Sequence, residues 1–342
     1  MSDILASEIE ESKPLVDFDK RKESWDVKKK YADQVSDISK EAVSESVQKQ
    51  GKRISMCASG IQFEQQEDGT LKLRKANFCR VRHCPVCQWR RSLMWRARFY
   101  DAIPDLIDQY PQHRWLFLTL TVKNCHVTEL REQIQKMNKA WHRLLARASF
   151  KPVEGWVRAI EVTKQSDNSG YAHPHFHVIL MVSPSYFKGD YLTREKWASL
   201  WQDALKVNYS PVVDIRIIRK KRRSSQEANS SGPSSVFESV KTACLEVFKY
   251  SVKPSDMLQD KDWFFEMVLQ LRKLRFLSSG GLLKKALYQG DVNREMVECE
   301  EGQESDEKES QETKTKYNLL FSWNRLVTKY LYNKRVIIPI RQ

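Results

Sequence analysis

One short stretch, HPHFHVIL at residues 173–180, strongly limits the structures that this chain can adopt. Side chains two positions apart on a β-strand point to the same face, so His173, His175 and His177 would lie together on one face. The apolar residues that alternate with them would point to the other face. Three imidazoles on one face repel each other when they carry charge. A divalent metal ion bound among them explains the pattern, because imidazole nitrogen is a common metal ligand.

Predicted strands and helices alternate through the middle of the chain. Strands are predicted from apolar and β-branched runs at 115–122, 156–164, 175–182 and 212–218. Helices are predicted from apolar residues at helical spacing within 130–145, 197–205 and 237–251. Thr128 and Thr193 are the expected N-caps of the first two helices, and the turn-rich segment 165–172 makes the two middle strands a hairpin. This order predicts an α+β fold with a central, mostly antiparallel sheet flanked by helices.

The predicted hairpin suggests a third metal ligand. Cross-strand neighbours have Cβ atoms about 5 Å apart, so the Glu161 carboxylate could reach an ion bound by His175 and His177. His173 competes for the same role, although Pro174 separates it from the other two histidines. Two neutral imidazoles would leave coordination positions open for phosphate oxygens. A solvent-facing Glu161 is the alternative interpretation.

The charge balance favours a polyanionic partner. The chain has 58 Lys and Arg against 44 Asp and Glu, a net charge of +14. An excess of this size is typical of proteins that bind nucleic acid. No apolar run approaches the roughly 18 residues of a membrane span, and the acidic N-terminus does not resemble a secretion signal. We therefore expect a cytoplasmic protein with no membrane partner, in which cysteines stay reduced and favour metal binding.

Cysteines cluster just before the first predicted strand. Cys79, Cys84 and Cys87 lie within CRVRHCPVC, and Cys57 lies upstream. Thiolates at this spacing can share one tetrahedral ion, with Cys57 or His83 as the fourth ligand. Four protein ligands close the coordination shell, which is typical of structural zinc. The sequence therefore predicts an N-terminal cysteine-rich, zinc-binding segment.

Basic residues follow the cysteines directly. Arg90, Arg91, Arg96 and Arg98 lie within twelve residues of Cys87, with Trp95 among them. A zinc knuckle followed by a basic helix favours DNA binding by these arginines. A solvated basic helix with no ligand is the alternative interpretation.

Three motifs in order resemble those of the replication initiators (Rep) of rolling-circle plasmids, within the HUH endonuclease superfamily. FLTLT at 117–121 resembles the first motif, and HPHFHVIL resembles the metal-binding second motif. EVFKYSVK at 246–253 resembles the third, in the group that pairs one tyrosine with a glutamate four residues earlier. CRVRHCPVC followed by QWRR also resembles the cysteine-rich segment of many such proteins. The likeness covers residues 55–285 in outline.

The resemblance implies metal-dependent, sequence-specific nicking of one strand at a plasmid origin, with strand transfer. Tyr250 would attack a DNA phosphate, forming a 5′-phosphotyrosyl bond and leaving a 3′-hydroxyl primer. Glu246 would act as general base on water at termination, and Lys253 would favour the phenolate or stabilise the transition state. In a helix these three side chains would share one face. Tyr250 and the four arginines are the expected DNA-binding residues.

The resemblance also implies cofactors and partners. Mg²⁺ or Mn²⁺ would be the catalytic ion and Zn²⁺ the structural one. The expected partners are plasmid origin DNA in single-stranded or extruded hairpin form, a host helicase and a host DNA polymerase. Whether the protein is a homodimer is left open.

The composition divides the chain into parts. Residues at the N-terminus alternate Lys and Glu, a basic run precedes a Ser/Gly/Pro stretch, and an acidic run lies near the C-terminus. The expected parts are a mobile charged arm at 1–50, a zinc-binding DNA-contact segment at 51–110, an HUH endonuclease domain at 111–290 with a flexible loop at 219–235, an acidic disordered linker at 291–316 and a C-terminal segment at 317–342.

Two other functions compete. Another HUH nuclease is the nearer one, but relaxases usually place the tyrosine before the histidines, and transposases are shorter and lack the cysteine segment. The other is a zinc-dependent DNA-binding regulator without catalysis. It predicts no covalent DNA adduct and no need for Tyr250.

Overall fold

The computed structural model of the chain describes residues 13–166, 170–189, 191–219, 234–287 and 317–337. The chain divides into two compact units. We call Met1–Met94 with Asp291–Gln342 the terminal unit, and Trp95–Gly290 the central unit. The first boundary between the two units lies after Met94, within helix α5 (Pro85–Gln109). The sequence had instead predicted a boundary at residue 110.

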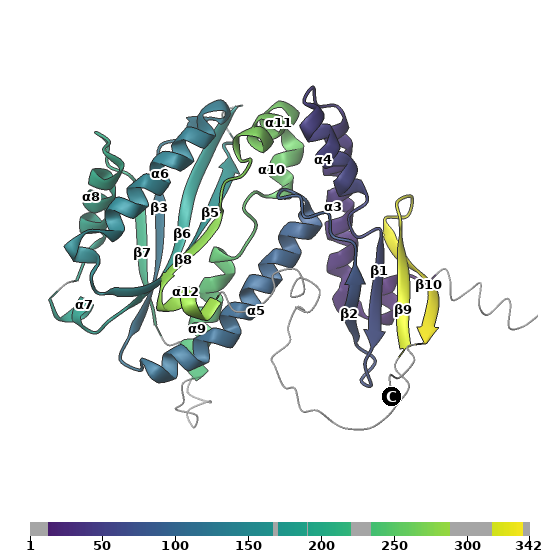
Figure 1. The fold of residues 1–342 in the computed structure, drawn as a ribbon, viewed down its shortest axis with the longest axis horizontal. Helices are drawn as coiled ribbons and strands as arrows, with labels where there is room; N and C mark the ends of the chain where they lie inside the picture. Colours follow the sequence, from purple (N-terminus) through teal and green to yellow (C-terminus); the bar gives the residue numbers. More distant parts are fainter. Residues whose placement is uncertain (1–12, 167–169, 190, 220–233, 288–316, 338–342) are drawn as a thin grey trace, which may run out of the picture. The chain divides into compact units, whose positions relative to one another are not determined.

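The terminal unit contains a four-stranded antiparallel sheet in the order β10-β9-β1-β2 (Figure 1). Its strands are β1 (Gly60–Gln65), β2 (Leu71–Ala76), β9 (Tyr317–Asn324) and β10 (Lys329–Ile337). Aromatic rings fill the core beside it, and Phe63 contacts both Trp25 and Phe321 with ring centroids 5.9 and 6.0 Å apart. The C-terminal segment is therefore part of the same sheet as β1.

The prediction of a mobile arm over residues 1–50 is wrong for residues 13–50. They form α2 (Leu15–Phe18), a 3₁₀ turn (Lys20–Lys22), α3 (Glu23–Lys40) and most of α4 (Glu45–Ser55). Trp25, Ala32 and Val35 are buried, so α3 has an apolar stripe despite its many charges. Residues 1–12 lie outside the described part of the chain. The same is true of most of the predicted loop at 219–235 and of the acidic linker at 291–316.

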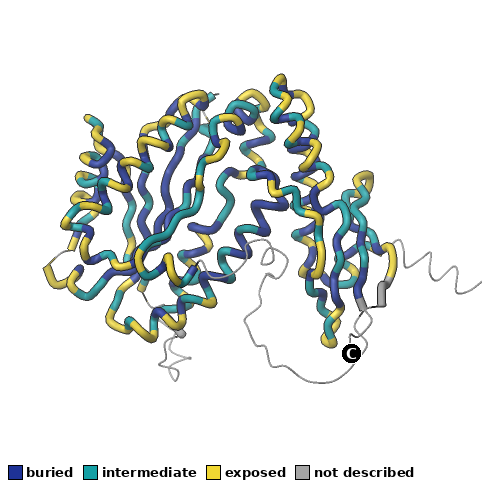
Figure 2. The backbone as a smooth tube through the Cα atoms, viewed as in Figure 1, coloured by how far each residue is buried: buried dark blue, intermediate teal, exposed yellow. Residues whose placement is uncertain are grey.

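The central unit is built on a six-stranded antiparallel sheet, which confirms the predicted α+β fold. Five strands run in the order β7-β3-β6-β5-β8, and β4 pairs with the beginning of β6 (Figure 1). The strands are β3 (Arg114–Thr121), β4 (Cys125–His126), β5 (Val153–Lys164), β6 (Tyr171–Val182), β7 (Val213–Ile218) and β8 (Leu277–Gly281). Strands β3 and β6 are buried along most of their length (Figure 2).

Helices cover both faces of this sheet. On one face α5, α9 (Ser234–Val247) and α12 (Leu282–Leu287) pack on β3, β5 and β6. On the other face α6 (Leu130–Leu145) and α8 (Arg194–Leu205) pack through tryptophans. The rings of Trp141 and Trp201 lie 6.4 and 6.0 Å from that of Phe176. The remaining helices are α7 (Ser185–Lys188), α10 (Pro254–Gln259) and α11 (Lys261–Gln270).

The face under α5 and α9 changes character along the strands, and this change positions the site. Phe117 and Ile179 are paired across β3 and β6 and belong to the buried core. The next pair on the same face is Thr119 with His177. Side chains alternate between the two faces with a period of two, so Thr119 and His177 lie on the same face as Phe117 and Ile179, one pair further along the strands. On this face the apolar core is therefore followed directly by polar side chains.

Two local predictions have different outcomes. Thr193 is the N-cap of α8, as predicted, because its hydroxyl accepts a hydrogen bond from the Lys196 backbone N–H at 3.3 Å. Thr128 is not the N-cap of α6. A 3₁₀ turn over Val127–Glu129 precedes that helix, and the Thr128 hydroxyl bonds Nδ1 of His126 at 2.8 Å.

The helix expected through residues 246–253 ends early. Helix α9 ends at Val247, so Tyr250 and Lys253 lie beyond it. The prediction that Glu246, Tyr250 and Lys253 share one helical face is therefore wrong. Among the described helices, none is both long and apolar enough to cross a membrane.

Candidate functional site

Three polar side chains meet on the sheet of the central unit. Glu161 on β5 is paired with His175 on β6, and His177 follows two residues later on the same face. Oε2 of Glu161 lies 2.9 Å from Nε2 of His175 and 2.8 Å from Nε2 of His177, and the two nitrogens are 3.1 Å apart. All three residues are buried. We call Glu161, His175 and His177 the donor triad.

The Nδ1 atoms of both histidines contact oxygen atoms, which orients the Nε2 atoms. Nδ1 of His175 lies 3.3 Å from the backbone carbonyl oxygen of His173. Nδ1 of His177 lies 3.3 Å from the hydroxyl of Thr119. With an ion bound at Nε2, the imidazole proton would lie on Nδ1, where a hydrogen bond to such an oxygen fixes the ring. Thr119 belongs to the FLTLT stretch, and the sequence had not assigned it a role.

The triad fits a divalent ion. In octahedral coordination, bonds of about 2.1 Å hold neighbouring ligand atoms about 3.0 Å apart. The three separations of 2.8, 2.9 and 3.1 Å match this geometry. Two imidazoles and one carboxylate on one side of an ion leave the other positions open to water or substrate oxygen. Among the described residues, the donor triad is one of two groups that could hold a metal ion.

The charge state of the triad favours cation binding. Burial alone would raise the pKa of Glu161. Hydrogen bonds from His175, His177 and Lys249 outweigh burial and hold that pKa well below its ordinary value, so the carboxylate is charged. Burial lowers the pKa of His177, which favours the neutral imidazole that binds metal ions.

His173 does not join the triad. Its Nδ1 lies 2.6 Å from the side-chain oxygen of Asn124, and burial lowers its pKa. Of the two candidates for third ligand, the structure therefore groups Glu161 rather than His173 with the histidine pair.

The segment with Tyr250 lies beside the triad. The backbone N–H of Val162 donates to the carbonyl of Ser251 at 2.8 Å, next to Glu161 on β5. Lys249 donates from Nζ to Oε2 of Glu161, also at 2.8 Å. Tyr250, which is half-buried, thus lies between two residues that are bound to β5. Because Glu161 contacts His175 and His177, these bonds hold the third motif close to the second.

Lys249 takes a position that the sequence reasoning had not given to it. Its ammonium also lies 2.8 Å from Oε2 of Glu246. The expected basic residue was Lys253, but Lys253 is exposed and is the N-cap residue of α10. The position of Lys249 directly before Tyr250 could have indicated a role at the site. The sequence analysis chose Lys253 instead, because it assumed that the helix continues and puts Tyr250 and Lys253 on one face.

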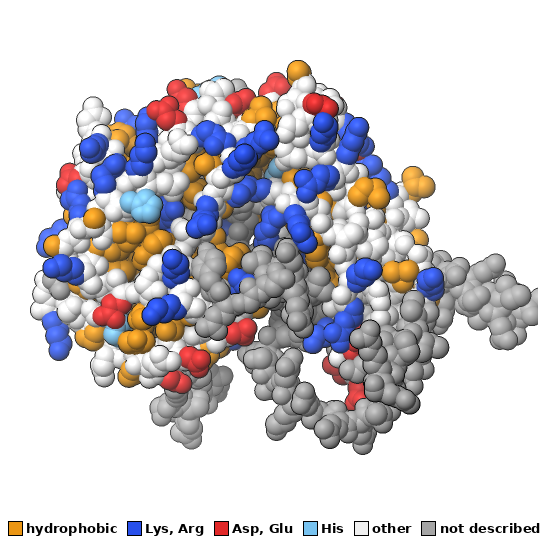
Figure 3. Space-filling model, viewed as in Figure 1, with side chains coloured by type: hydrophobic (Ala, Val, Ile, Leu, Met, Phe, Trp, Pro, Cys, Tyr) orange, Lys and Arg blue, Asp and Glu red, His pale blue; other side chains and the backbone are white. Residues whose placement is uncertain are grey.

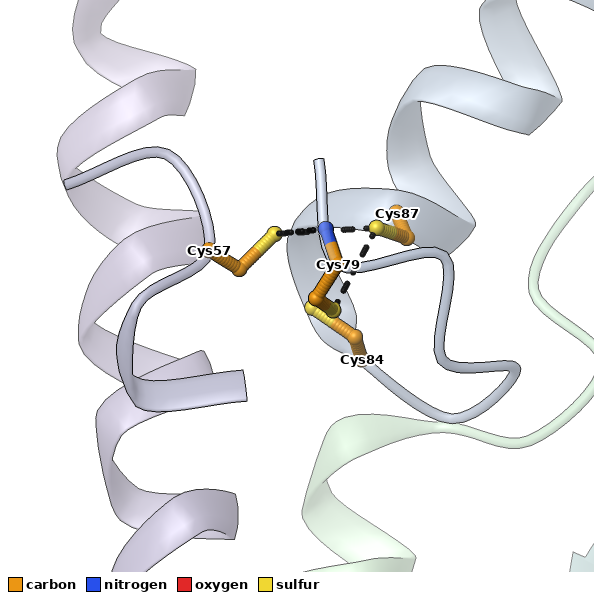
Figure 4. Close-up of side chains that lie close together, drawn as sticks. All are labelled: Cys57, Cys79, Cys84 and Cys87. Carbon is orange, nitrogen blue, oxygen red and sulfur yellow. Dashed lines mark hydrogen bonds between the residues drawn. The ribbon is translucent and has the colours of Figure 1, made fainter. Parts of the chain in front are cut away.

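Four cysteines of the terminal unit form a second possible metal site (Figure 4). Cys57 follows α4, Cys79 and Cys84 lie in the loop after β2, and Cys87 is in the first turn of α5. Sγ of Cys87 lies 3.6 Å from that of Cys57 and 3.7 Å from that of Cys79. Tetrahedral zinc with bonds of about 2.3 Å holds sulfurs about 3.8 Å apart. The four thiols therefore fit zinc.

The fourth member of this cluster is Cys57, not His83. His83 is buried, and burial together with the charge of Arg82 lowers its pKa to about 3. Hydrogen bonds from Cys57, Cys79 and Cys84 hold the pKa of the Cys87 thiol far below its ordinary value, whereas hydrogen bonds to Cys79 and Cys87 raise the pKa of Cys57, and burial raises that of Cys84. Without a metal ion the cluster therefore favours a single thiolate, at Cys87. Such a thiolate is the form of cysteine that binds metal ions.

The four expected DNA-binding arginines are not equivalent. Arg90 is 2% exposed and lies over the rings of Trp25 and Trp89, and Arg98 is 8% exposed. These two positions do not fit a direct DNA contact, because the side chains are used in packing. Arg91 and Arg96 are partly exposed. Lys and Arg side chains predominate over acidic ones on the face shown in Figure 3.

Known proteins resemble this chain over most of its length. A family model described as "Replication protein" matches residues 70–331. A protein named "Protein rep" from Streptococcus pneumoniae is 35% identical over 238 residues, which cover 68% of this chain and 69% of that protein. Another "Protein rep", from Bacillus amyloliquefaciens, is 35% identical over 300 residues, which cover 82% of this chain and 87% of that protein. No solved structure matches the chain.

Proposed function

The chain belongs to the replication protein family, and from this premise we propose that it initiates rolling-circle replication of a plasmid by nicking one strand at the origin. The observation that supports nicking is the contact between the donor triad and the segment that contains Tyr250. That contact holds the backbone on both sides of Tyr250 close to a group of side chains that could bind a cation.

In the proposed reaction the Tyr250 hydroxyl attacks the phosphorus of a DNA phosphodiester. A bond forms between the tyrosyl oxygen and phosphorus, and the bond from phosphorus to the 3′ oxygen breaks. The phenol loses its proton and the leaving oxygen gains one, which gives a 5′-phosphotyrosyl bond and a 3′-hydroxyl. Bound to Glu161, His175 and His177, Mg²⁺ or Mn²⁺ would polarise the phosphate and offset its charge.

Other residues of the third motif act at later or supporting steps. At termination Glu246 takes a proton from a water molecule, and that water attacks the phosphorus of the regenerated nick site. The bond from phosphorus to the 3′ oxygen breaks and that oxygen gains a proton, so the strand is cut by hydrolysis without a second covalent protein–DNA bond. The Glu246 carboxylate is 56% exposed, so water reaches it. Lys253 stabilises negative charge on the phosphate.

The proposal includes partners and a structural zinc. The substrate is single-stranded or extruded hairpin origin DNA. In the cytoplasm a host helicase separates the strands and a host DNA polymerase extends the 3′-hydroxyl. Zinc on the four cysteines stabilises the terminal unit. Arg91 and Arg96, the two partly exposed arginines, contact DNA phosphates.

The test is an incubation of the protein with supercoiled plasmid that contains its own origin, in Mn²⁺ or Mg²⁺. We expect nicked circles and a protein band covalently linked to DNA. Tyr250→Phe removes one oxygen and little volume, so it should still bind origin DNA but give neither product. An adduct formed by Tyr250→Phe would assign the nucleophile to another residue. Origin binding by the wild type without nicking would support a regulator instead.

A further inference from the structure

One ammonium group joins two carboxylates at the proposed active site. Lys249 Nζ lies 2.8 Å from Oε2 of Glu161 and 2.8 Å from Oε2 of Glu246. Glu161 belongs to the donor triad, and Glu246 belongs to the motif that contains Tyr250. We propose that Lys249 is a positioning residue, which fixes Glu246 and the segment with Tyr250 relative to the triad. The inference rests on the proposed function.

The backbone on both sides of Lys249 is held in place. Phe248 is buried in the core that α5 and α9 share with the sheet. The carbonyl of Ser251 accepts the backbone hydrogen bond from Val162 on β5. Only Lys249 and Tyr250 lie between these two anchors. An ammonium bound to β5 at this point therefore restricts the position of its neighbour Tyr250.

The Glu246 carboxylate depends on Lys249 more than the Glu161 carboxylate does. The side chain of Glu161 is 5% exposed and also bonds both histidines. The side chain of Glu246 is 56% exposed, at the C-terminal end of α9. Without a cation between them, the two carboxylates would repel each other, and Glu246 would turn into solvent. Lys249 therefore holds the proposed general base beside the triad.

Removal of the ammonium has two opposite effects. Lys249→Met keeps an unbranched apolar chain but takes a positive charge away from Oε2 of Glu161. A divalent cation then meets less repulsion, so the variant should bind Mn²⁺ at least as tightly as the wild type. Loss of positioning should lower kcat for nicking by about 10–100-fold. KM for an origin oligonucleotide should stay within about threefold of wild type.

Two further variants separate positioning from charge and from folding. Lys249→Arg keeps the positive charge and should restore part of kcat. Lys136→Met is the matched control, because Lys136 also bonds a glutamate, Glu132 at 2.9 Å, on an exposed part of α6. This control should nick and bind Mn²⁺ like the wild type. Calorimetry with Mn²⁺ alone gives a readout that is independent of activity.

A double-mutant cycle tests the link to Glu246. The rate measured is hydrolytic cleavage of a second origin oligonucleotide by the isolated protein–DNA adduct, in which Tyr250 is already bonded to DNA. If Lys249 acts on this step by holding Glu246, then Lys249→Met should slow hydrolytic cleavage when Glu246 is present. The same change should cause no further slowing when Glu246 is already replaced by Gln. Multiplying effects of the two changes would show that Lys249 does not act through Glu246, and would overturn this part of the inference.

The outcomes separate the inference from the proposed function. Slower nicking by Lys249→Met, with Mn²⁺ binding unchanged or tighter, supports the inference. Nicking at the wild-type rate overturns it and leaves the proposed function intact. Weaker Mn²⁺ binding, with nicking restored by saturating Mn²⁺, also overturns it, because Lys249 would then serve ion binding alone. Failure of the wild type to nick overturns both.

Discussion

Glu161→Gln should both destabilise the central unit and prevent nicking. Oε2 of Glu161 accepts three hydrogen bonds from nitrogen, at 2.9, 2.8 and 2.8 Å. Gln keeps the shape and one oxygen, but it lacks the negative charge that strengthens these bonds. It also removes the only carboxylate of the donor triad, so Mn²⁺ binding should weaken together with nicking.

The size of the effect follows from the three bonds. A hydrogen bond to a charged group contributes about 2 kcal/mol, and a bond between neutral groups about 1 kcal/mol. Each of the three bonds should therefore lose about 1 kcal/mol, which gives about 3 kcal/mol in the free energy of unfolding. For a unit of this size, the melting temperature should fall by about 6–12 °C.

The effect should depend on pH in a defined direction. The pKa of Glu161 in the folded protein lies below its ordinary value of 4.5, so its contribution to stability is complete above that value. As the pH falls through the folded pKa, this contribution is lost. The difference in unfolding free energy between the wild type and Glu161→Gln should therefore be constant from pH 6 to 8 and shrink below about pH 4.5.

The assay is urea unfolding of the metal-free proteins across this pH range, followed by Mn²⁺ calorimetry. Glu154→Gln is the control, because Glu154 lies on the same strand and bonds His113 at 3.0 Å with a more exposed carboxylate. This control should cost less than about 1 kcal/mol. The reasoning would be refuted if Glu161→Gln lost no more unfolding free energy than Glu154→Gln does. It would also be refuted if the loss for Glu161→Gln grew as the pH falls.

Two further variants test the zinc cluster and the third motif. Cys84→Ser should reduce the zinc content per chain and weaken origin binding, because it removes one of four thiolate ligands. Elemental analysis of native protein without zinc would contradict the proposed zinc site. Glu246→Ala should still nick and form adducts but accumulate single strands longer than unit length in a replication assay. Normal termination by this variant would exclude Glu246 as the general base.

The donor triad could be predicted because a strand has a fixed period. Two histidines separated by one residue must share a face, and a short hairpin sets Glu161 opposite His175. The cysteine spacing was informative for a similar reason, since short loops bring the thiols together. These features depend on contacts between residues that are close in the sequence.

Other features depend on tertiary contacts that a local pattern does not contain. The helical spacing beyond Val247 favoured a continued helix, but there the chain instead bonds the edge of β5 through Ser251. Because the chain leaves the helix and bonds β5, Lys249 rather than Lys253 contacts the triad. Charged residues of α3 likewise suggested a mobile arm, because Asp26, Lys29 and Asp33 are themselves part of its buried face.

The order of synthesis gives the terminal unit a particular folding problem. Strand β1 lies between β2 and β9, yet β9 begins only at Tyr317. At about 5–20 residues per second, translation leaves the β9 edge of β1 bare for roughly 10–50 s. The whole central unit, Trp95–Gly290, leaves the ribosome during that interval. A nascent chain would therefore have its proposed catalytic unit before its terminal sheet is closed, with a strand edge open to aggregation.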